Sequence, residues 1–256
     1  MIIDLHMHVE NVAALGWTMS AADCIVAMDE AGVDLAAIMT LTDYPGLNEN
    51  GMGLIERGCA EFPGRLTGFV RLNPVQLESA LLALEIAVRG HGFTGVKLHP
   101  VTTLAHPGGP ATVALIRRAG ELGVPTLFHC GDESYTTPLA VAEAARQCPA
   151  STVILGHMGG YFHVDEALEV AEALPNVLLE TSGMPYPARI AEAVQRLGPE
   201  RVLFGSDGPI ASPAVERRKV ELAGLDATSL ALVLGGNAER LLKLDGSTGP
   251  GGKAVA

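Results

Sequence analysis

The sequence predicts a (β/α)8 barrel, an α/β fold in a single domain. Three observations predict it: short apolar strands alternate with helical stretches eight times, three of the strands (Val153–Leu155, Val177–Leu179 and Val202–Phe204) are continuous apolar runs, and the chain has 256 residues. Continuous apolar runs are typical of parallel strands that are buried on both faces. A barrel of this kind commonly fills about 250 residues. An open sheet with fewer strands is the weaker alternative, because no glycine-rich dinucleotide-binding motif follows the first strand.

The predicted elements follow one another along the whole chain. The strands are Ile2–His8, Val33–Leu41, Leu66–Leu72, Gly95–Leu98, Pro125–His129, Thr152–Leu155, Val177–Glu180 and Arg201–Phe204. The helices are Ser20–Ala31, Gly53–Glu61, Leu77–Arg89, Ala111–Leu122, Leu139–Gln147, Val164–Ala173, Pro187–Leu197, Pro213–Glu221 and Ala227–Leu244. Ser20 is suited to cap the first helix, and Gly32 to end it. We expect residues 1–244 to form a metal-dependent barrel domain and the glycine-rich residues 245–256 to be a disordered tail.

Composition narrows the class of protein. The net charge of −12 argues against a nucleic-acid partner, because binding phosphates requires a basic surface. No apolar run reaches the roughly 18–20 residues of a membrane span, and no signal peptide is visible. The four cysteines lack C-x-x-C spacing, so we interpret them as reduced thiols of a cytoplasmic protein. We expect a small-molecule substrate and no membrane partner; the apolar composition permits a homodimer without requiring one.

Polar residues collect at the carboxyl ends of the predicted strands. They are His6, His8, Arg71, Asn73, Lys97, His99, His129, His157, Glu180 and Asp207. In a (β/α)8 barrel these strand ends meet on one face, where active sites are built. Polarity at the start of a loop alone predicts Ser, Asn, Gly and Asp, and it does not predict that four strands end with histidine.

Four of these residues form a donor set for one divalent metal ion. His6 and His8 are two residues apart, so they project from the same face of the first strand, roughly 6–7 Å apart. With His129 and Asp207 they offer three imidazoles and a carboxylate, which suits Zn²⁺ first and also Mn²⁺ or Fe²⁺. Asp207 can also accept the proton of a water that the ion activates. We assign general acid or base catalysis to His157, which lies in a glycine-rich turn.

Three further residues are candidates for substrate binding. Lys97 and His99 share one face of their strand, so both are expected to face the site. Lys97 is suited to bind a substrate carboxylate or to pair with Glu180. Arg71 can hold a carboxylate through its two-pronged guanidinium, and an ion pair that closes the barrel mouth is an equal alternative.

Several stretches resemble the amidohydrolase superfamily, in the amidohydrolase-related branch (amidohydrolase 2) that includes aminocarboxymuconate-semialdehyde decarboxylase and other non-oxidative decarboxylases. They are His6-Met7-His8, Gly95-Val96-Lys97-Leu98-His99-Pro100, Phe128-His129, Gly156-His157-Met158-Gly159-Gly160, Phe204-Gly205-Ser206-Asp207-Gly208-Pro209 and the final stretch 235–242. The resemblance implies a (β/α)8 barrel with one metal ion, usually zinc. It implies metal ligation by His6, His8, His129 and Asp207, with His157 as the catalytic histidine. Elsewhere in the superfamily a lysine on strand four is carbamylated and bridges two metals, but the context of Lys97 resembles the mononuclear branch.

Together these observations predict a metal-dependent, amidohydrolase-like hydrolase that uses an activated water on a small amide, ester or lactone. The alternative is a metal-dependent non-oxidative decarboxylase of a small carboxylic acid, which would use the same ligands. A barrel that binds a metabolite without catalysis is a third hypothesis, and the complete ligand set argues against it. The chain is short for this branch, and loop insertions shape the substrate pocket, so the sequence leaves substrate and reaction type open.

Overall fold

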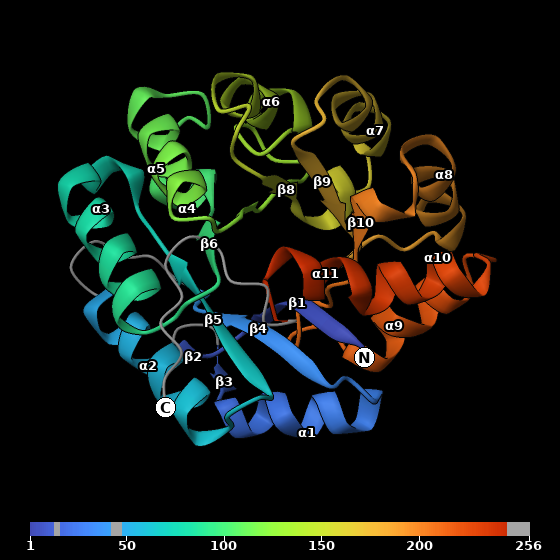
Figure 1. Ribbon diagram of the computed structural model, residues 1–256, viewed down its shortest axis with the longest axis horizontal. Coiled ribbons are helices and arrows are strands. Elements are labelled where there is room, and N and C mark those ends of the chain that lie inside the picture. Colours follow the sequence, from blue (N-terminus) through green and yellow to red (C-terminus); the bar gives the residue numbers. More distant parts are fainter. Residues whose placement is uncertain (13–15, 42–47, 245–256) are drawn as a thin grey trace.

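The barrel is formed by parallel strands that follow chain order (Figure 1). The computed structural model describes residues 1–12, 16–41 and 48–244. Within these residues, the eight barrel strands are β1 (Ile3–His8), β4 (Leu35–Met39), β5 (Leu66–Arg71), β6 (Gly95–Leu98), β7 (Thr126–Phe128), β8 (Val153–Leu155), β9 (Val177–Glu180) and β10 (Val202–Leu203). The ring closes between β1 and the chain after β10, because the amide of Leu5 donates to the carbonyl of Phe204 at 3.0 Å. The predicted fold class is therefore confirmed.

Helices cover the outside of the ring (Figure 1). They are α1 (Ala21–Ala31), α2 (Asn48–Glu61), α3 (Leu77–Glu85), α4 (Pro100–Thr103), α5 (Pro110–Glu121), α6 (Pro138–Gln147), α7 (Val164–Ala173), α8 (Pro187–Leu197), α9 (Pro213–Glu221), α10 (Ala227–Ala231) and α11 (Asn237–Leu241). Short 3₁₀ turns span Pro74–Gln76, Gly156–Gly159 and Pro199–Arg201, and π-helical turns span Ile86–Gly90 and Leu232–Gly236.

Local sequence explains several of these boundaries. The side chain of Ser20 accepts a hydrogen bond from the amide of Asp23, whose carboxylate accepts from the amide of Ser20, so α1 begins with a capping box. It ends at Gly32, whose φ of 63° favours glycine. Strands β6 and β9 have the predicted bounds. The predicted tail, 245–256, lies outside the described residues.

Four features differ from the prediction. An antiparallel hairpin of β2 (Glu10–Val12) and β3 (Trp17–Met19) follows β1. Helix α2 begins at Asn48, five residues before the predicted start, and the short helix α4 follows β6. The long final helix is not one regular α-helix, because a π-helical turn separates α10 from α11.

The barrel interior is filled by apolar side chains from alternate strand positions. The cluster contains Ile3, Leu5, Leu35, Ala37, Met39, Phe69, Leu127, Ile154, Leu203, Ala238 and Leu242. The ring of Phe69 lies so close to Gly95 that a Cβ there would be 2.4 Å from it, so only glycine fits beside this ring. Because Ala238 and Leu242 belong to the cluster, α11 closes one end of the barrel, as Figure 1 also shows.

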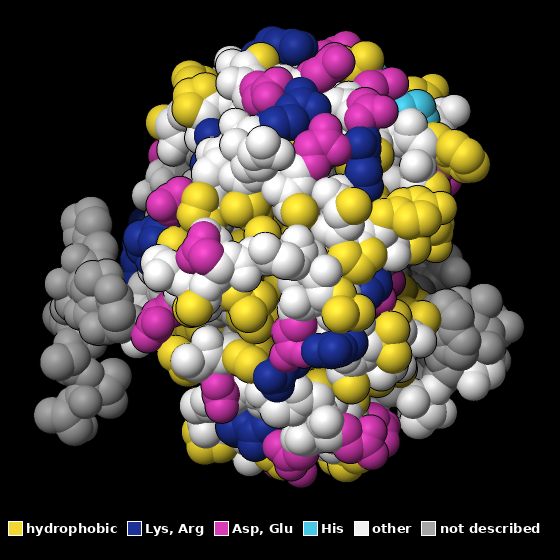
Figure 2. All heavy atoms as spheres, turned by 90° about the vertical axis from the view of Figure 1, so that its right-hand side faces the viewer, with side chains coloured by type: hydrophobic (Ala, Val, Ile, Leu, Met, Phe, Trp, Pro, Cys, Tyr) yellow, Lys and Arg dark blue, Asp and Glu magenta, His cyan; other side chains and the backbone are white. Residues whose placement is uncertain are grey.

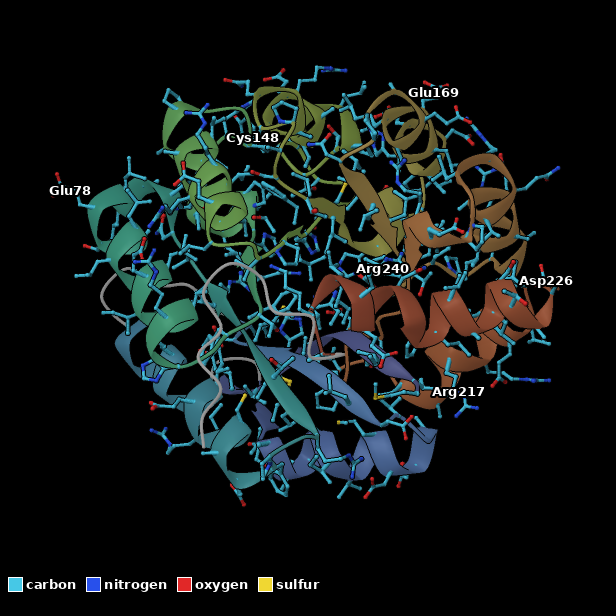
Figure 3. The ribbon with its side chains drawn as sticks, in the orientation of Figure 1. Glu78, Cys148, Glu169, Arg217, Asp226 and Arg240 are labelled. Atoms are coloured by element: carbon cyan, nitrogen blue, oxygen red, sulfur yellow. The ribbon has the colours of Figure 1, made fainter. Side chains whose placement is uncertain are left out.

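The outer surface carries charges of both signs. Figure 2 shows Lys and Arg side chains interspersed with Asp and Glu on one side of the molecule. In Figure 3, Glu78, Glu169 and Asp226 lie on the outer ring of helices, whereas Arg240 lies over the end that α11 closes. None of the helices within the described residues is long and apolar enough to cross a membrane.

Candidate metal centre

His6, His8 and Asp207 meet at the carboxyl end of the barrel. The two histidines lie at the end of β1, and Asp207 follows β10. Nε2 of His8 is 2.9 Å from Oδ1 of Asp207, and Nε2 of His6 is 3.3 Å from the same oxygen. One ligand atom from each residue lies within 4.8 Å of the others, and we call these residues the three-ligand group. The prediction that both histidines face the same way is confirmed, since their ring centroids are 5.0 Å apart.

The other ring nitrogens show that this group fits a cation. Nδ1 of His6 is 3.1 Å from Oε2 of Glu180, and Nδ1 of His8 is 3.3 Å from the carbonyl oxygen of Thr40. Both partners accept, so each Nδ1 donates its proton outward and each Nε2 lone pair points toward Asp207. Such outer partners orient histidine ligands in metal sites. Three acceptors at these distances are stable only with a proton or a cation between them, which is what a divalent ion would supply.

Lys97 provides a positive charge beside this group. Its Nζ is 2.7 Å from Nε2 of His6, and its side chain is 1% exposed. Because Nε2 of His6 has one lone pair, the ammonium group and a metal ion compete for it. Lys97 therefore lies at the site itself, as the sequence predicts.

Burial and charge prepare the group for metal binding. Burial lowers the pKa of His6 well below its usual value, which keeps the ring in the neutral form that binds metals. Burial opposes ionisation of Asp207, but the rings of His6, His8 and His157 around it hold its pKa well below the usual value. The three-ligand group thus places the neutral ring of His6 beside an ionised carboxylate.

The predicted fourth ligand lies in a neighbouring pair of histidines. Nδ1 of His129 is 3.1 Å from Nε2 of His157, and Nε2 of His129 is 3.4 Å from Oε2 of Glu133. The ring of His99 stacks on His129 with centroids 4.0 Å apart and planes 6° apart. Among the described residues, the structure does not bring His129 into the three-ligand group. Its role as a metal ligand stays a prediction.

Both candidate catalytic residues have strained backbones. His157 has φ of 58° and Asp207 has φ of 61°, in the left-handed region that costs a non-glycine residue about 1–3 kcal/mol. The turn of His157 packs against the end of β7, because a Cβ at Gly156 would lie 2.6 Å from the carbonyl oxygen of Phe128. Strain of this kind collects at functional sites. Burial lowers the pKa of His157 to about 4, so its ring is neutral at neutral pH.

Arg71 and Lys97 bring two cations to adjacent strands. They are direct partners in the register of β5 and β6, and both are nearly fully buried. Nη1 of Arg71 donates to the carbonyl of Thr40 at 3.3 Å, and Nη2 donates to Oγ1 of Thr102 at 3.1 Å. The carbonyl of Thr40 thus links Arg71 to the ring of His8.

A cavity of about 920 Å³ borders the guanidinium side of the site. It is lined by Thr40 and Arg71 at the barrel mouth, by Ile55 of α2, and by Ala80 and Ile86 on and after α3. Cavities of this size hold small-molecule ligands in many proteins.

Comparison with known proteins identifies the family. A family model described as amidohydrolase matches residues 3–244. The chain belongs to the amidohydrolase family. No curated protein matches this amidohydrolase in sequence.

Solved structures with the same fold are distant in sequence from this amidohydrolase. A 2,6-dihydroxybenzoate decarboxylase from Rhizobium is 15% identical, with a TM-score of 0.74 over 95% of this chain and 99% of that chain. A 5-carboxyvanillate decarboxylase from Sphingomonas paucimobilis is 18% identical, with a TM-score of 0.73 over 94% and 98% of the two chains. A dihydroxybenzoic acid decarboxylase from Polaromonas, with bound manganese and the inhibitor 2-nitroresorcinol, is 18% identical, with a TM-score of 0.76 over 95% and 97%.

The amidohydrolase site contains residues that sequence analysis did not assign. Glu180 and Ser182 each contact both His6 and His157. Thr40 contacts His8, and Glu133 contacts His129. Glu180 was visible as a polar strand end. A carboxylate at a strand end is a natural partner for the second nitrogen of a histidine ligand, which is a signal for Glu180. The carbonyl of Thr40 gives no such signal in the sequence.

Proposed function

We propose that the protein is a metal-dependent, non-oxidative decarboxylase of a small carboxylic acid. The observation that carries this proposal is the pair of buried cations, Arg71 and Lys97, which are 4% and 1% exposed beside the three-ligand group. Both side chains are suited to bind and orient a substrate carboxylate, Arg71 through its two-pronged guanidinium and Lys97 through its ammonium group. The decarboxylases with the same fold support this reaction over the hydrolysis that the sequence placed first.

The three-ligand group would hold one divalent ion, with His129 as the predicted fourth ligand. Nitrogen and oxygen donors suit Zn²⁺ and Mn²⁺ alike, and the manganese in the Polaromonas enzyme makes Mn²⁺ as good a candidate as Zn²⁺. Bound there, the ion would act as a Lewis acid on a substrate oxygen.

The surrounding residues would bind the substrate and move one proton. Arg71 and Lys97 bind and orient the carboxylate. When the bond between the substrate carbon and its carboxylate breaks, CO₂ leaves and the electron pair stays on the carbon, which must take up one proton. His157 is the candidate to deliver that proton, because its ring lies beside the three-ligand group, with its centroid 5.2 Å from that of His6.

Hydrolysis of an amide, ester or lactone is the second candidate function. Asp207 favours it, because its carboxylate is held in the ionised form and its side chain is 30% exposed. It can therefore accept a proton from an attacking water.

Product analysis separates the two reactions. The protein is reconstituted with Zn²⁺ or Mn²⁺ and incubated in D₂O with aromatic and unsaturated acids that carry a ¹³C carboxylate. We expect release of ¹³CO₂ and one deuterium on the carbon that lost it. Incorporation of ¹⁸O from labelled water into a new carboxylate of an ester, lactone or amide, without CO₂ release from any acid, would establish the hydrolase instead.

A further inference from the structure

Glu180 lies at the centre of a buried hydrogen-bond network at the end of β9. Its side chain is fully buried, and Oε2 is 3.1 Å from Nδ1 of His6. The same oxygen accepts from Oγ of Ser182 at 2.8 Å and from the amide of His157 at 3.3 Å. The other oxygen accepts from the amide of Ser182. A Cβ at Gly205 would lie 2.3 Å from Oε1, so a glycine is required next to this carboxylate.

Ser182 carries this network to His157. A serine hydroxyl has one proton, and Oγ of Ser182 donates it to Glu180. Oγ must therefore accept from Nδ1 of His157, which is 2.8 Å away. The carbonyl oxygen of Ser182 is a second acceptor, at 3.3 Å from the same nitrogen.

Proton bookkeeping then assigns one tautomer to each ring. Nδ1 of His6 donates to a carboxylate, and Nδ1 of His157 donates to a hydroxyl whose own proton is already used. A neutral ring that carries its proton on Nδ1 has an unprotonated Nε2. That atom of His6 faces Asp207, and that of His157 faces Nδ1 of His129.

We propose that Glu180 and Ser182 are positioning residues that set the tautomer of His6 and His157 together. The carboxylate of Glu180 orients His6, the candidate metal ligand, by direct contact. It orients His157, the candidate acid-base residue, through Ser182. This inference rests on the proposed function for the roles of His6 and His157, but the hydrogen bonds themselves do not depend on which reaction is catalysed.

Histidine tautomers can be read by NMR without a substrate. Long-range ¹H–¹⁵N spectra of the ¹⁵N-labelled full chain loaded with Zn²⁺ distinguish an Nδ1–H ring from an Nε2–H ring, and His157→Gln assigns the signal of His157. We expect His6 and His157 to be Nδ1–H in the wild-type protein. Ser182→Ala should move His157 toward the Nε2–H form and leave His6 unchanged. Thr181→Val is the matched control, because Oγ1 of buried Thr181 has no hydrogen-bond partner among the described residues.

Metal affinity tests the other branch of the network. Glu180→Gln keeps the size of the side chain and removes the charge that faces Nδ1 of His6. We expect it to weaken Zn²⁺ binding about 10–100-fold, the usual effect of losing a residue that orients a ligand. Ser182→Ala should change the affinity less than about threefold, because it leaves in place Glu180, which lies nearer to Nδ1 of His6 (3.1 Å) than Oγ of Ser182 does (3.4 Å).

Any one of three results would overturn the proposal. The first is a wild-type His157 in the Nε2–H form, and the second is the same His157 tautomer in Ser182→Ala as in wild type. The third is a Zn²⁺ affinity that is unchanged in Glu180→Gln. If Glu180→Gln does not fold, the tautomer of His157 in Ser182→Ala still decides. A protein that shows these tautomers but releases no CO₂ from any acid would contradict the proposed function and leave this inference intact.

Discussion

The barrel interior has two parts that come from the same strands but differ in chemistry. The lower part is the apolar cluster at the end that α11 closes, and the upper part is the group of polar residues at the carboxyl ends of the strands. On β5 the inward-facing residue Phe69 is followed two positions later by Arg71, and on β7 Leu127 is followed by His129. In the lower part, burying each large apolar side chain stabilises the fold by about 1.5–3 kcal/mol. In the upper part, burial opposes the charged forms, so each polar group needs a partner or a ligand.

The pKa shifts express the same difference. Burial lowers the pKa of His6, His99, His129 and His157 alike, so the upper part contains neutral rings that would be charged in solution at mildly acidic pH. The lower part has no comparable dependence on pH, because its cluster is made of apolar side chains. The comparison teaches that the lower part provides stability, while the upper part is held in place for chemistry.

Replacing His157 should give the largest effect, and that effect should be on turnover. We expect His157→Ala to lower kcat about 10²–10⁴-fold on the carboxylic acid identified by screening, because it removes the proposed proton carrier. Metal content and the free energy of unfolding should stay close to wild type. His163→Ala is the control for removing a ring, because His163 is the N-cap residue of α7 and contacts Glu166 of that helix. Full metal loss in His157→Ala would make this residue a ligand.

Replacing Phe69 should lower stability and leave the metal site almost unchanged. Phe69→Ala removes the largest fully buried apolar side chain of the interior cluster, so we expect unfolding in urea to require about 3–5 kcal/mol less. The affinity for Zn²⁺ of the folded fraction should change little. Leu82→Ala on α3, where the side chain is 62% exposed, should change stability by less than about 0.5 kcal/mol. If fully folded Phe69→Ala bound Zn²⁺ much more weakly than the wild-type protein, the two parts would not be independent of each other.

Acidification should destabilise the metal-free protein through its upper part. Burial, and then the neighbouring His129, Arg71 and Lys97, lower the pKa of His99 to about 2. Between pH 7 and 5 the unfolded chain therefore gains a proton at this residue that the folded chain does not, and stability falls. We expect His99→Gln to reduce that loss by about 1–2 kcal/mol, measured by urea unfolding at the two pH values in EDTA. An identical pH dependence in both proteins would contradict the lowered pKa.

A helix cap far from both parts should give the smallest effect. Ser20→Ala removes the side-chain half of the capping box of α1, which should cost about 1 kcal/mol of stability. Urea unfolding measures this, and metal content should be that of wild type. Loss of metal in this variant would mean that any destabilisation empties the site, and metal content would then not report on the ligands.

Sequence patterns predicted the fold because the strands are short apolar runs with clear ends. Strand β9 stops at Glu180, where a titratable residue follows the apolar run, and β6 begins at Gly95 after a helix-to-strand turn. The hairpin of β2 and β3 escaped prediction because three residues per strand are too few to show alternation. The early start of α2 also escaped, because Gly51 and Gly53 lower helix propensity within it.

Part of the site could be predicted from local spacing alone. The two-residue period of a strand places His6 and His8 on one face, and the barrel rule places Asp207 near them. The contact of Ser182 with His6 joins residues 176 positions apart, which no local pattern reveals. Thr40 acts through its carbonyl oxygen, a group that every residue has, so its side chain gives no signal.

Metal content tests most directly whether the upper part of the barrel is a mononuclear metal centre. The protein is purified without added metal and analysed by elemental mass spectrometry, beside the His6→Ala/His8→Ala variant and after reconstitution with Zn²⁺ or Mn²⁺. We expect about one equivalent of a divalent ion in the wild-type protein and almost none in the double variant, because one ion needs the Nε2 atoms of both rings. Two equivalents would contradict a mononuclear centre and implicate Lys97 as a carbamylated bridge. Absence of metal from both proteins, even after reconstitution, would contradict the metal centre altogether.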